Sequence, residues 1–264
     1  MTDSTSSPLD ILAIAAHRDD VEQTCGGTLL KAAQGGQRVG ILDLTQGEMG
    51  TRGTAEDRAR EAADAARILG AVWRRALDIP DGRVENTWEN RLKVASMIRE
   101  TRPRVVILPY WQGRHPDHYT TSVLGYEACF LAGLRKLALN SQPSGSDESI
   151  PGAKIDSSPK DGLPPHRPFK IIYATLYYDV RPTFVVDISE HFEGKFNSIM
   201  AYKSQFSDQE AGKDLFPAHD EIRARVDSMA RYYGALGGVK YGEPFLQKEV
   251  GLVDDLLAIP VKSI

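Results

Sequence analysis

Short apolar runs alternate with segments of helical periodicity along the first half of the chain. The apolar runs predict buried β-strands at residues 11–15, 39–44, 72–79 and 104–110. Helical spacing of apolar residues predicts a helix after each of the first three strands, and these helices end near Gly35, Gly70 and Pro103. Alternating strands and helices joined by crossovers of this length are typical of a parallel sheet.

The second half of the chain predicts a long loop and a different mixture of elements. A helix is expected over residues 119–139, and residues 140–168 are rich in Pro, Ser, Gly and Lys, which predicts a partly mobile loop insertion. Two strands are then expected at residues 169–178 and 183–188. A helix through Phe192, Phe196, Ile199 and Met200 is expected next, and a last helix at residues 220–233.

These elements predict an α/β fold. The expected architecture is a Rossmann-like, doubly wound, mostly parallel sheet with helices on both faces and a C-terminal β/α extension. For a chain of 264 residues we expect one domain over residues 1–264, with residues 1–8 as a flexible N-terminus.

Composition and charge argue against several classes of partner. The 32 basic and 36 acidic residues give a formal net charge of −4, without the basic stripe that neutralises nucleic-acid phosphates. The apolar runs are far shorter than the roughly 20 residues that span a bilayer, and the polar N-terminus lacks an export signal pattern. We therefore expect a cytoplasmic protein with neither nucleic acid nor a membrane as its partner.

The two cysteines, Cys25 and Cys129, lie in different helical segments without the CxxC spacing of metal or redox motifs. They are interpreted as reduced core thiols. A zinc-ligand role for Cys25 is the less favoured alternative, because histidines and an aspartate already supply three ligands.

A polar turn, Ala16-His17-Arg18-Asp19-Asp20, follows the first predicted strand and precedes a helix. His17 and Asp20 are three residues apart, so both side chains can converge on one metal ion. Asp19 projects differently and suits a general base beside the metal. The alternative is that both aspartates cap the helix, since Asp is favoured at helix starts.

A second polar turn, His115-Pro116-Asp117-His118, follows the strand at residues 104–110. In open α/β sheets the ligand crevice lies at the carboxyl ends of the strands. If the two strands are neighbours, His17, Asp20 and either His115 or His118 can bind one metal ion and leave a fourth position open, as catalytic zinc requires. Iron also fits two histidines and one aspartate.

A glycine-rich loop at residues 47–53 follows the second strand and is expected to overhang the same edge of the sheet. It carries Glu48 and Arg52. The charged residues just after it are interpreted as the solvated face of a helix; these are Glu56, Asp57, Arg58, Arg60 and Glu61.

Four motifs together resemble the LmbE/PIG-L family of zinc-dependent N-acetylglucosaminyl deacetylases. They are the sequences HRDD, GGTL, GEMGTRGT and HPDH, which begin at His17, Gly26, Gly47 and His115. The resemblance runs from Leu9 to about Gly251, apart from one loop. Segments at residues 201–206, 231–234 and 238–245 are similar to the bacillithiol branch, which removes acetate from N-acetylglucosaminyl malate.

The resemblance implies a substrate that is a small N-acetyl amino-sugar conjugate, one Zn²⁺ per chain with Fe²⁺ as an alternative, and a homo-oligomer. It implies Asp19 as the catalytic base and His115 as oxyanion stabiliser or acid. It also implies these metal ligands: His17, Asp20 and His118.

Three residues are candidates for substrate binding. Arg52 is expected to bind a substrate carboxylate, because a guanidinium binds carboxylates in bidentate fashion. Glu48 either binds sugar hydroxyls or pairs with Arg52. Arg167 resembles a family arginine beside the catalytic carboxylate. Asp117 either orients an imidazole or caps the next helix, and a capping or other structural role is preferred.

One position departs from the family pattern, because Arg18 stands where the family usually has proline. Either other contacts hold the turn, or the arginine charge alters activity by lowering the pKa of Asp19. Two other functions remain as alternatives: a deacetylase or amidase for a different N-acetyl sugar conjugate, and a non-catalytic sugar- or nucleotide-binding domain. A complete set of base and metal ligands argues against the second.

Overall fold

The computed structural model describes residues 8–140, 162–177, 179–206 and 219–261. Its centre is a seven-stranded sheet of order β3-β2-β1-β4-β5-β7-β6, in which all pairings are parallel except those made by β7. The strands are β1 (Ile11–Ala15), β2 (Val39–Asp43), β3 (Trp73–Ala76), β4 (Val105–Pro109), β5 (Lys170–Ala174), β6 (Phe184–Asp187) and β7 (Gly242–Leu246).

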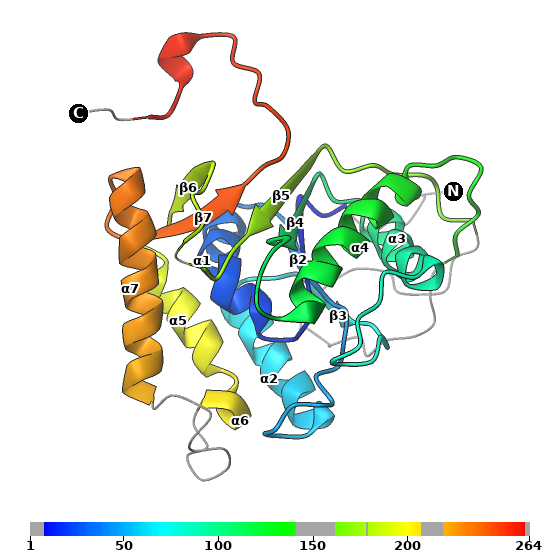
Figure 1. Ribbon diagram of the computed structural model, residues 1–264, viewed down its shortest axis with the longest axis horizontal. Coiled ribbons are helices and arrows are strands. Elements are labelled where there is room, and N and C mark those ends of the chain that lie inside the picture. Colours follow the sequence, from blue (N-terminus) through cyan, green and yellow to red (C-terminus); the bar gives the residue numbers. More distant parts are fainter. Residues whose placement is uncertain (1–7, 141–161, 178, 207–218, 262–264) are drawn as a thin grey trace.

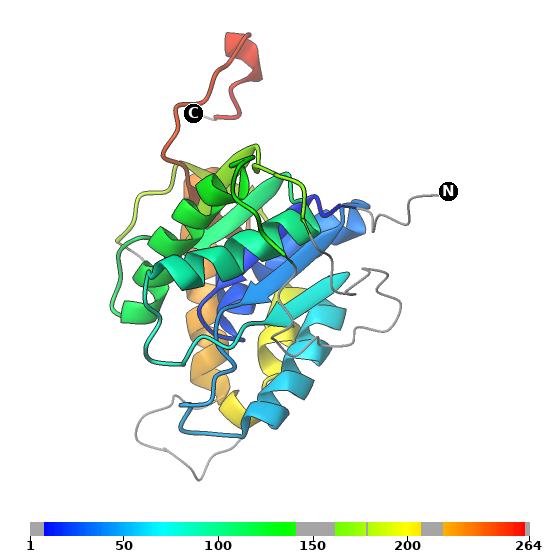
Figure 2. The same cartoon turned by 90° about the vertical axis from the view of Figure 1, so that its right-hand side faces the viewer.

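Helices cover both faces of this sheet, as expected (Figures 1 and 2). One face carries α3 (Trp88–Thr101) and α4 (Pro116–Ala132). The other face carries α1 (Asp20–Gln34), α2 (Ala55–Ile68), α5 (Phe192–Met200) and α7 (His219–Gly237), with the short α6 (Lys203–Phe206) after α5. Within the described part of the chain, no helix has the length and apolar run needed to cross a membrane.

The alternation of side chains along a strand divides the core into two layers. Along β1, Leu12 and Ile14 pack into the cluster under α3 and α4, whereas Ala13 and Ala15 pack against α1. The central strands are buried on both sides, which explains why they are continuous apolar runs in the sequence.

The sheet changes winding direction between β1 and β4. These strands are direct neighbours, with Ile11 opposite Val105 and Ala13 opposite Ile107. The helix after β1 lies on one face and the helix after β4 on the other, so the two polar turns meet at the crevice between them (Figure 2). The expectation that these two strands are neighbours is confirmed.

The sequence prediction is wrong at β7, which it does not include. The segment Gly-Glu-Pro-Phe-Leu has no strand-like alternation and contains proline, yet it pairs antiparallel with both β5 and β6. The helix expected over residues 119–139 instead spans Pro116–Ala132 and ends at Gly133. Residues 141–161, most of the predicted insertion, and residues 1–7 lie outside the described residues.

Helix α1 contains a break that β7 stabilises. Cys25 has non-helical φ and ψ of −138° and 17°. The Glu243 carboxylate of β7 accepts from the amides of Gly27 and Thr28 at 2.9 and 2.7 Å, and Lys195 of α5 donates to the same carboxylate at 2.5 Å. Because both charged side chains are buried, this contact ties α1, α5 and β7 together.

Two adjacent glycines in α1 give a matched test of packing. A Cβ at Gly27 would lie 2.9–3.0 Å from the Ile188 side chain, whereas a Cβ at Gly26 would meet its nearest neighbour at 3.5 Å. Gly27→Ala is therefore expected to destabilise the protein by about 1–3 kcal/mol through overpacking. Urea unfolding measures the effect. Gly26→Ala is the control and should cost much less, so equal losses for the two variants would contradict this packing.

Candidate active site

The polar turns after β1 and β4 bring three side chains together. His17 Nδ1 lies 3.3 Å from His118 Nε2. The Asp20 carboxylate lies 3.4 Å from His17 Nδ1 and 3.2 Å from His118 Nε2. Two ring nitrogens and a carboxylate thus face a common point, and the sequence prediction that these side chains converge agrees with the geometry.

The spacing of these groups fits a tetrahedral metal site. Bonds of about 2.0–2.1 Å from zinc to nitrogen or oxygen place neighbouring ligand atoms about 3.3 Å apart. The two ring nitrogens are 3.3 Å apart, and each lies 3.2–3.4 Å from one of the two oxygens of the Asp20 carboxylate, so the separations are close to that edge. Two facing imidazole nitrogens beside a buried carboxylate also form a donor set typical of zinc or iron.

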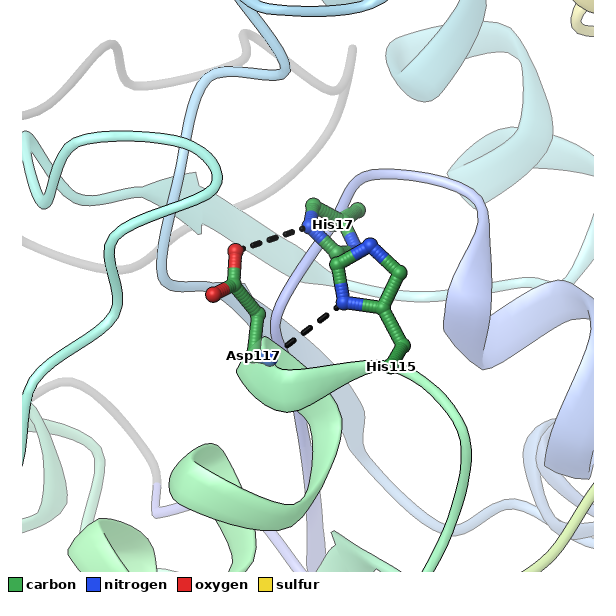
Figure 3. A group of neighbouring side chains, drawn as sticks. All are labelled: His17, His115 and Asp117. Atoms are coloured by element: carbon green, nitrogen blue, oxygen red, sulfur yellow. Dashed lines mark hydrogen bonds and ion pairs between the residues drawn. The ribbon is translucent and has the colours of Figure 1, made fainter.

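The outer nitrogen of His17 is held by two further carboxylates. His17 Nε2 lies 3.1 Å from Asp81 and 3.3 Å from Asp117, and Figure 3 shows the Asp117 contact. Burial disfavours the charged imidazole, but Asp20, Asp117 and Asp81 outweigh it and raise the pKa of His17 to about 12. A metal ion at this position would displace the proton from Nδ1, and the carboxylates of Asp81 and Asp117 would then keep the remaining proton on Nε2, which is the ligating tautomer.

Asp117 does not cap helix α4, so the capping interpretation is wrong, but its carboxylate holds a neighbouring loop and contacts His17. The residue is 2% exposed, and its carboxylate accepts from the amides of Gly82 and Val84 at 2.8 and 3.2 Å. The N-cap of α4 is His115, whose Nδ1 accepts from the Asp117 amide. Asp117 therefore fixes the loop after β3 and one metal-ligand histidine together.

Asp117→Asn is expected to weaken metal binding about 10–100-fold, since it removes a carboxylate that orients and polarises a ligand. Competition with a chromophoric chelator measures the metal affinity. Asp64→Asn, at an exposed position of α2, is the control. Unchanged affinity in the Asp117 variant would show that Asp81 alone holds His17.

Asp19 occupies the N-cap position of α1, but its side chain makes no capping hydrogen bond. Instead its carboxylate accepts from Arg58 Nη2 at 3.3 Å. The capping alternative thus fails for this side chain. Asp20 likewise directs one oxygen back to the His17 amide, at 2.9 Å. Asp19 therefore lies next to the group formed by His17, Asp20 and His118 but is not one of its members.

Arg58 is a site residue that the sequence analysis missed. It is 5% exposed, not part of a solvated face as predicted, and it lies under the glycine-rich loop. Gly47 has φ of +73°, and a Cβ there would lie 2.8 Å from Arg58 Nε. The available signal was helical spacing, because Arg58 shares a face of α2 with the buried Ala62 and Ala65.

His115 lies against both metal-ligand histidines. Its ring stacks on His118 with centroids 4.7 Å apart and meets His17 edge-on at 4.8 Å. Burial and the His17 and His118 rings keep the pKa of His115 below its usual value. Because Nδ1 accepts from the Asp117 amide, the proton of the neutral ring is on Nε2 (Figure 3).

A second group of ligand-type side chains, His17, His115 and Asp117, also lies within 4.8 Å. Its carboxylate already accepts from two backbone amides and faces the Nε2 proton of His17. This group is therefore the less favoured candidate for a metal ion, and His17, Asp20 and His118 form the preferred candidate set. Cys25 belongs to neither group, and burial raises the pKa of its thiol to about 12, in agreement with a core thiol.

Arg18 is buried beneath neighbouring segments and contacts their backbone carbonyls. Its Nη1 donates to the carbonyls of Ala55 and Gln46 at 2.8 and 3.2 Å. The Arg18 carbonyl in turn accepts from Arg74 Nη2 and from the Tyr202 hydroxyl. Contacts from α2, β3 and the segment before α6 therefore hold the turn that a proline would otherwise stiffen.

The structure gives different positions to the proposed substrate-binding residues of the glycine-rich loop. Glu48 is exposed at the rim, where it accepts from the Asp81 amide at 2.8 Å. Arg52 is buried, and its Nη1 donates to the Gln205 carbonyl at 2.9 Å while Gln205 Nε2 donates back to the Arg52 carbonyl. Arg52 thus joins the loop to α6.

The structure does not bring Arg167 to the site. It precedes β5, at the amino edge of the sheet, whereas the metal-ligand histidines follow the carboxyl edge. Its guanidinium donates to the Phe130 carbonyl at 3.2 Å and lies 4.8 Å from the Phe130 ring centroid, near the C-terminal end of α4. The arginine that contacts the Asp19 carboxylate is Arg58.

The fold and the site together define an α/β protein with a three-residue candidate metal centre and a neighbouring carboxylate at the sheet crevice, the arrangement of a metal-dependent hydrolase. A family profile described as "PIG-L: GlcNAc-PI de-N-acetylase" matches residues 12–129. The diacetylchitobiose deacetylase of Thermococcus kodakarensis is 30% identical over 244 residues, which cover 88% of this chain and 80% of the relative. The chain belongs to the PIG-L/LmbE family of deacetylases.

Two further comparisons agree with this assignment. The 1D-myo-inositol 2-acetamido-2-deoxy-alpha-D-glucopyranoside deacetylase 2 of Catenulispora acidiphila is 25% identical over 278 residues, covering 88% of this chain and 90% of the relative. The crystal structure of a conserved protein from Thermus thermophilus, TT1542, has a TM-score of 0.75 and 38% identity. It covers 93% of this chain and 98% of that protein, and the predicted fold class is confirmed.

Proposed function

We propose that this protein is a metal-dependent hydrolase that removes the N-acetyl group from an N-acetylglucosamine conjugate. The observation that carries the proposal is the position of Asp19, a carboxylate beside three ligand atoms spaced for one metal ion but not part of that set. A binding domain has no need of such a base. The acetylated sugars in the names of the relatives support the N-acetyl group as the reacting part.

His17, Asp20 and His118 would hold one Zn²⁺ per chain, or Fe²⁺, which supplies Lewis acidity at the scissile amide. Asp19 accepts a proton from the attacking water and then delivers it to the leaving amine. Arg58, 3.3 Å away, fixes the orientation of the Asp19 carboxylate. The Nε2 proton of His115 is available to stabilise the oxyanion of the tetrahedral intermediate.

The substrate proposed from the sequence is N-acetylglucosaminyl L-malate, the bacillithiol precursor. An acidic aglycone calls for a guanidinium close to the reacting amide. Arg58 adjoins Asp19, whereas Arg52 would first have to release the Gln205 carbonyl. We therefore assign contact with the substrate carboxylate to Arg58, with Arg52 and the rim residue Glu48 supporting the loop above it.

Acetate release from four compounds tests the reaction and the substrate separately. The panel is N-acetylglucosaminyl malate, the corresponding inositol glycoside, diacetylchitobiose and free N-acetylglucosamine. Cleavage of the malate glycoside at the highest kcat/KM is the expected result, with Arg58→Lys losing that preference more than Arg52→Lys does. Preference for another conjugate would overturn the malate assignment alone. Cleavage of none, with metal bound, would favour a binding domain.

A further inference from the structure

A C-terminal arm, residues 247–261, leaves the body of the protein after β7. Its only regular element is a 3₁₀ turn, η1 (Leu256–Ala258), and Figures 1 and 2 show it extending away from the sheet and helices. Five apolar side chains of the arm are 70–98% exposed: Val250, Leu252, Leu256, Leu257 and Val261. So many neighbouring exposed apolar side chains are typical of an interaction segment.

The base of the arm is fixed to the body. Lys248 Nζ lies 4.8–4.9 Å from the ring centroids of Trp111, Tyr126 and Tyr173. Three aromatic faces around one ammonium give a favourable cation–π contact, and each pair strengthens the attachment. These contacts therefore fix the direction in which the arm extends from the body of the protein.

A groove with a volume of about 790 Å³ lies beside the base of the arm. The C-terminal half of α4 and the start of β5 form its floor, and Val250 and Leu252 of the arm form one wall. Phe130 and Phe169 in this groove are 55% and 78% exposed. The groove thus offers aromatic surface that the described residues leave largely uncovered.

The charges of the arm and the groove are complementary. Asp254 and Asp255 lie between the apolar pairs of the arm. Arg167 and Lys170 line the groove, and among the described residues neither has a carboxylate partner. The lining also includes Glu127, which pairs with Arg91, and Glu249 of the arm itself, so the basic side chains exceed the acidic ones by one. This pairing also accounts for Arg167, which is too far from the active site to bind substrate there.

We propose that the arm of one copy of this chain docks in the groove of a second copy, which docks its own arm in return. Val250 and Leu252 of the arm line the groove of their own chain. The chain then extends beyond this groove, so η1 lies away from it (Figure 1). A molecule that carries both an apolar arm and a complementary groove can close a two-fold interface by exchanging arms. Leu256 and Leu257 fill the partner's groove, and Asp254 and Asp255 meet its basic side chains.

The oligomeric mass of the full chain gives the first test, by light scattering after size-exclusion chromatography. The wild type is expected to be a dimer or a multiple of one. Leu256→Asp with Leu257→Asp should lower the mass, whereas the control Leu236→Asp, also an exposed leucine but on α7, should leave it unchanged. A monomeric wild type, or an arm variant of wild-type mass, would overturn the proposal.

Disulfide trapping identifies which groove receives the arm. Leu257→Cys and Phe169→Cys are placed in separate chains of different tag length, mixed, and oxidised. Cys25 is buried in α1 and should not compete, whereas Cys129 lines this groove, so both chains also carry Cys129→Ala. A disulfide between the two chains is expected. If the mixture gives no cross-linked species while a doubly substituted chain closes an internal disulfide, the arm folds onto its own groove and the exchange is wrong.

Discussion

Asp19→Asn is expected to lower kcat for acetate release by roughly 10²–10⁴-fold while the protein keeps its metal. Asparagine preserves the shape of the side chain and its contact with Arg58, but it cannot accept a proton. His17, Asp20 and His118 are untouched, so metal content should stay at the wild-type level. Steady-state kinetics on the preferred conjugate, together with metal analysis of the same sample, measure both quantities.

Asp64→Asn is the matched control for this variant, because Asp64 is an exposed residue of α2 paired with Arg67. Its kcat should equal that of the wild type. A kcat within tenfold of wild type for Asp19→Asn would rule out Asp19 as the base. Loss of metal from that variant would instead make Asp19 a ligand, which the contact with Arg58 argues against.

Glu243→Leu is expected to cost about 3–5 kcal/mol of unfolding free energy, the typical loss when one partner of a buried ion pair is removed. The substitution leaves the buried Lys195 ammonium without its carboxylate. It also removes the acceptor of the Gly27 and Thr28 amides at the break in α1. Urea unfolding followed by circular dichroism measures the change.

Two comparisons separate this effect from a general loss of packing. Glu193→Leu removes the carboxylate of an exposed pair with Arg223 and should cost only a small part of the Glu243→Leu loss. Adding Lys195→Met to Glu243→Leu should recover stability, since no unpaired buried charge then remains. Equal losses in the Glu243 and Glu193 variants would mean that the buried network contributes little.

The sequence predicts that His17, Asp20 and His118 lie close together, because local rules place these residues. Each ligand follows a buried parallel strand, and strands of this kind end at one edge of the sheet. His17 and Asp20 need only a three-residue spacing at a helix start to converge. The convergence of His118 with His17 and Asp20 further requires that β1 and β4 are neighbours in the sheet. Alternating strands and helices are compatible with that arrangement.

The residues that the sequence analysis misjudged depend on contacts between distant segments. The sequence around Arg58 is typical of a solvated helix face, but the glycine-rich loop covers this side chain. Asp117 stands at the start of a helix, where Asp is typical of a cap, but its carboxylate accepts hydrogen bonds from the loop after β3. Strand β7 lacks the apolar pattern of a buried strand because it contains a buried glutamate, Glu243. The carboxylate of Glu243 accepts hydrogen bonds from the amides of Gly27 and Thr28, which are more than 200 residues earlier in the chain. The single domain and the cytoplasmic location stay predictions.

The most direct test of the proposed metal-dependent chemistry is metal content measured alongside acetate release. The purified protein is expected to hold one zinc or iron ion per chain, and a chelator should remove both the metal and the activity. Adding back Zn²⁺ should restore activity to the wild type but not to His118→Ala, which lacks one ligand. Full acetate release by the metal-free protein, or wild-type metal content in His118→Ala, would contradict the site described here.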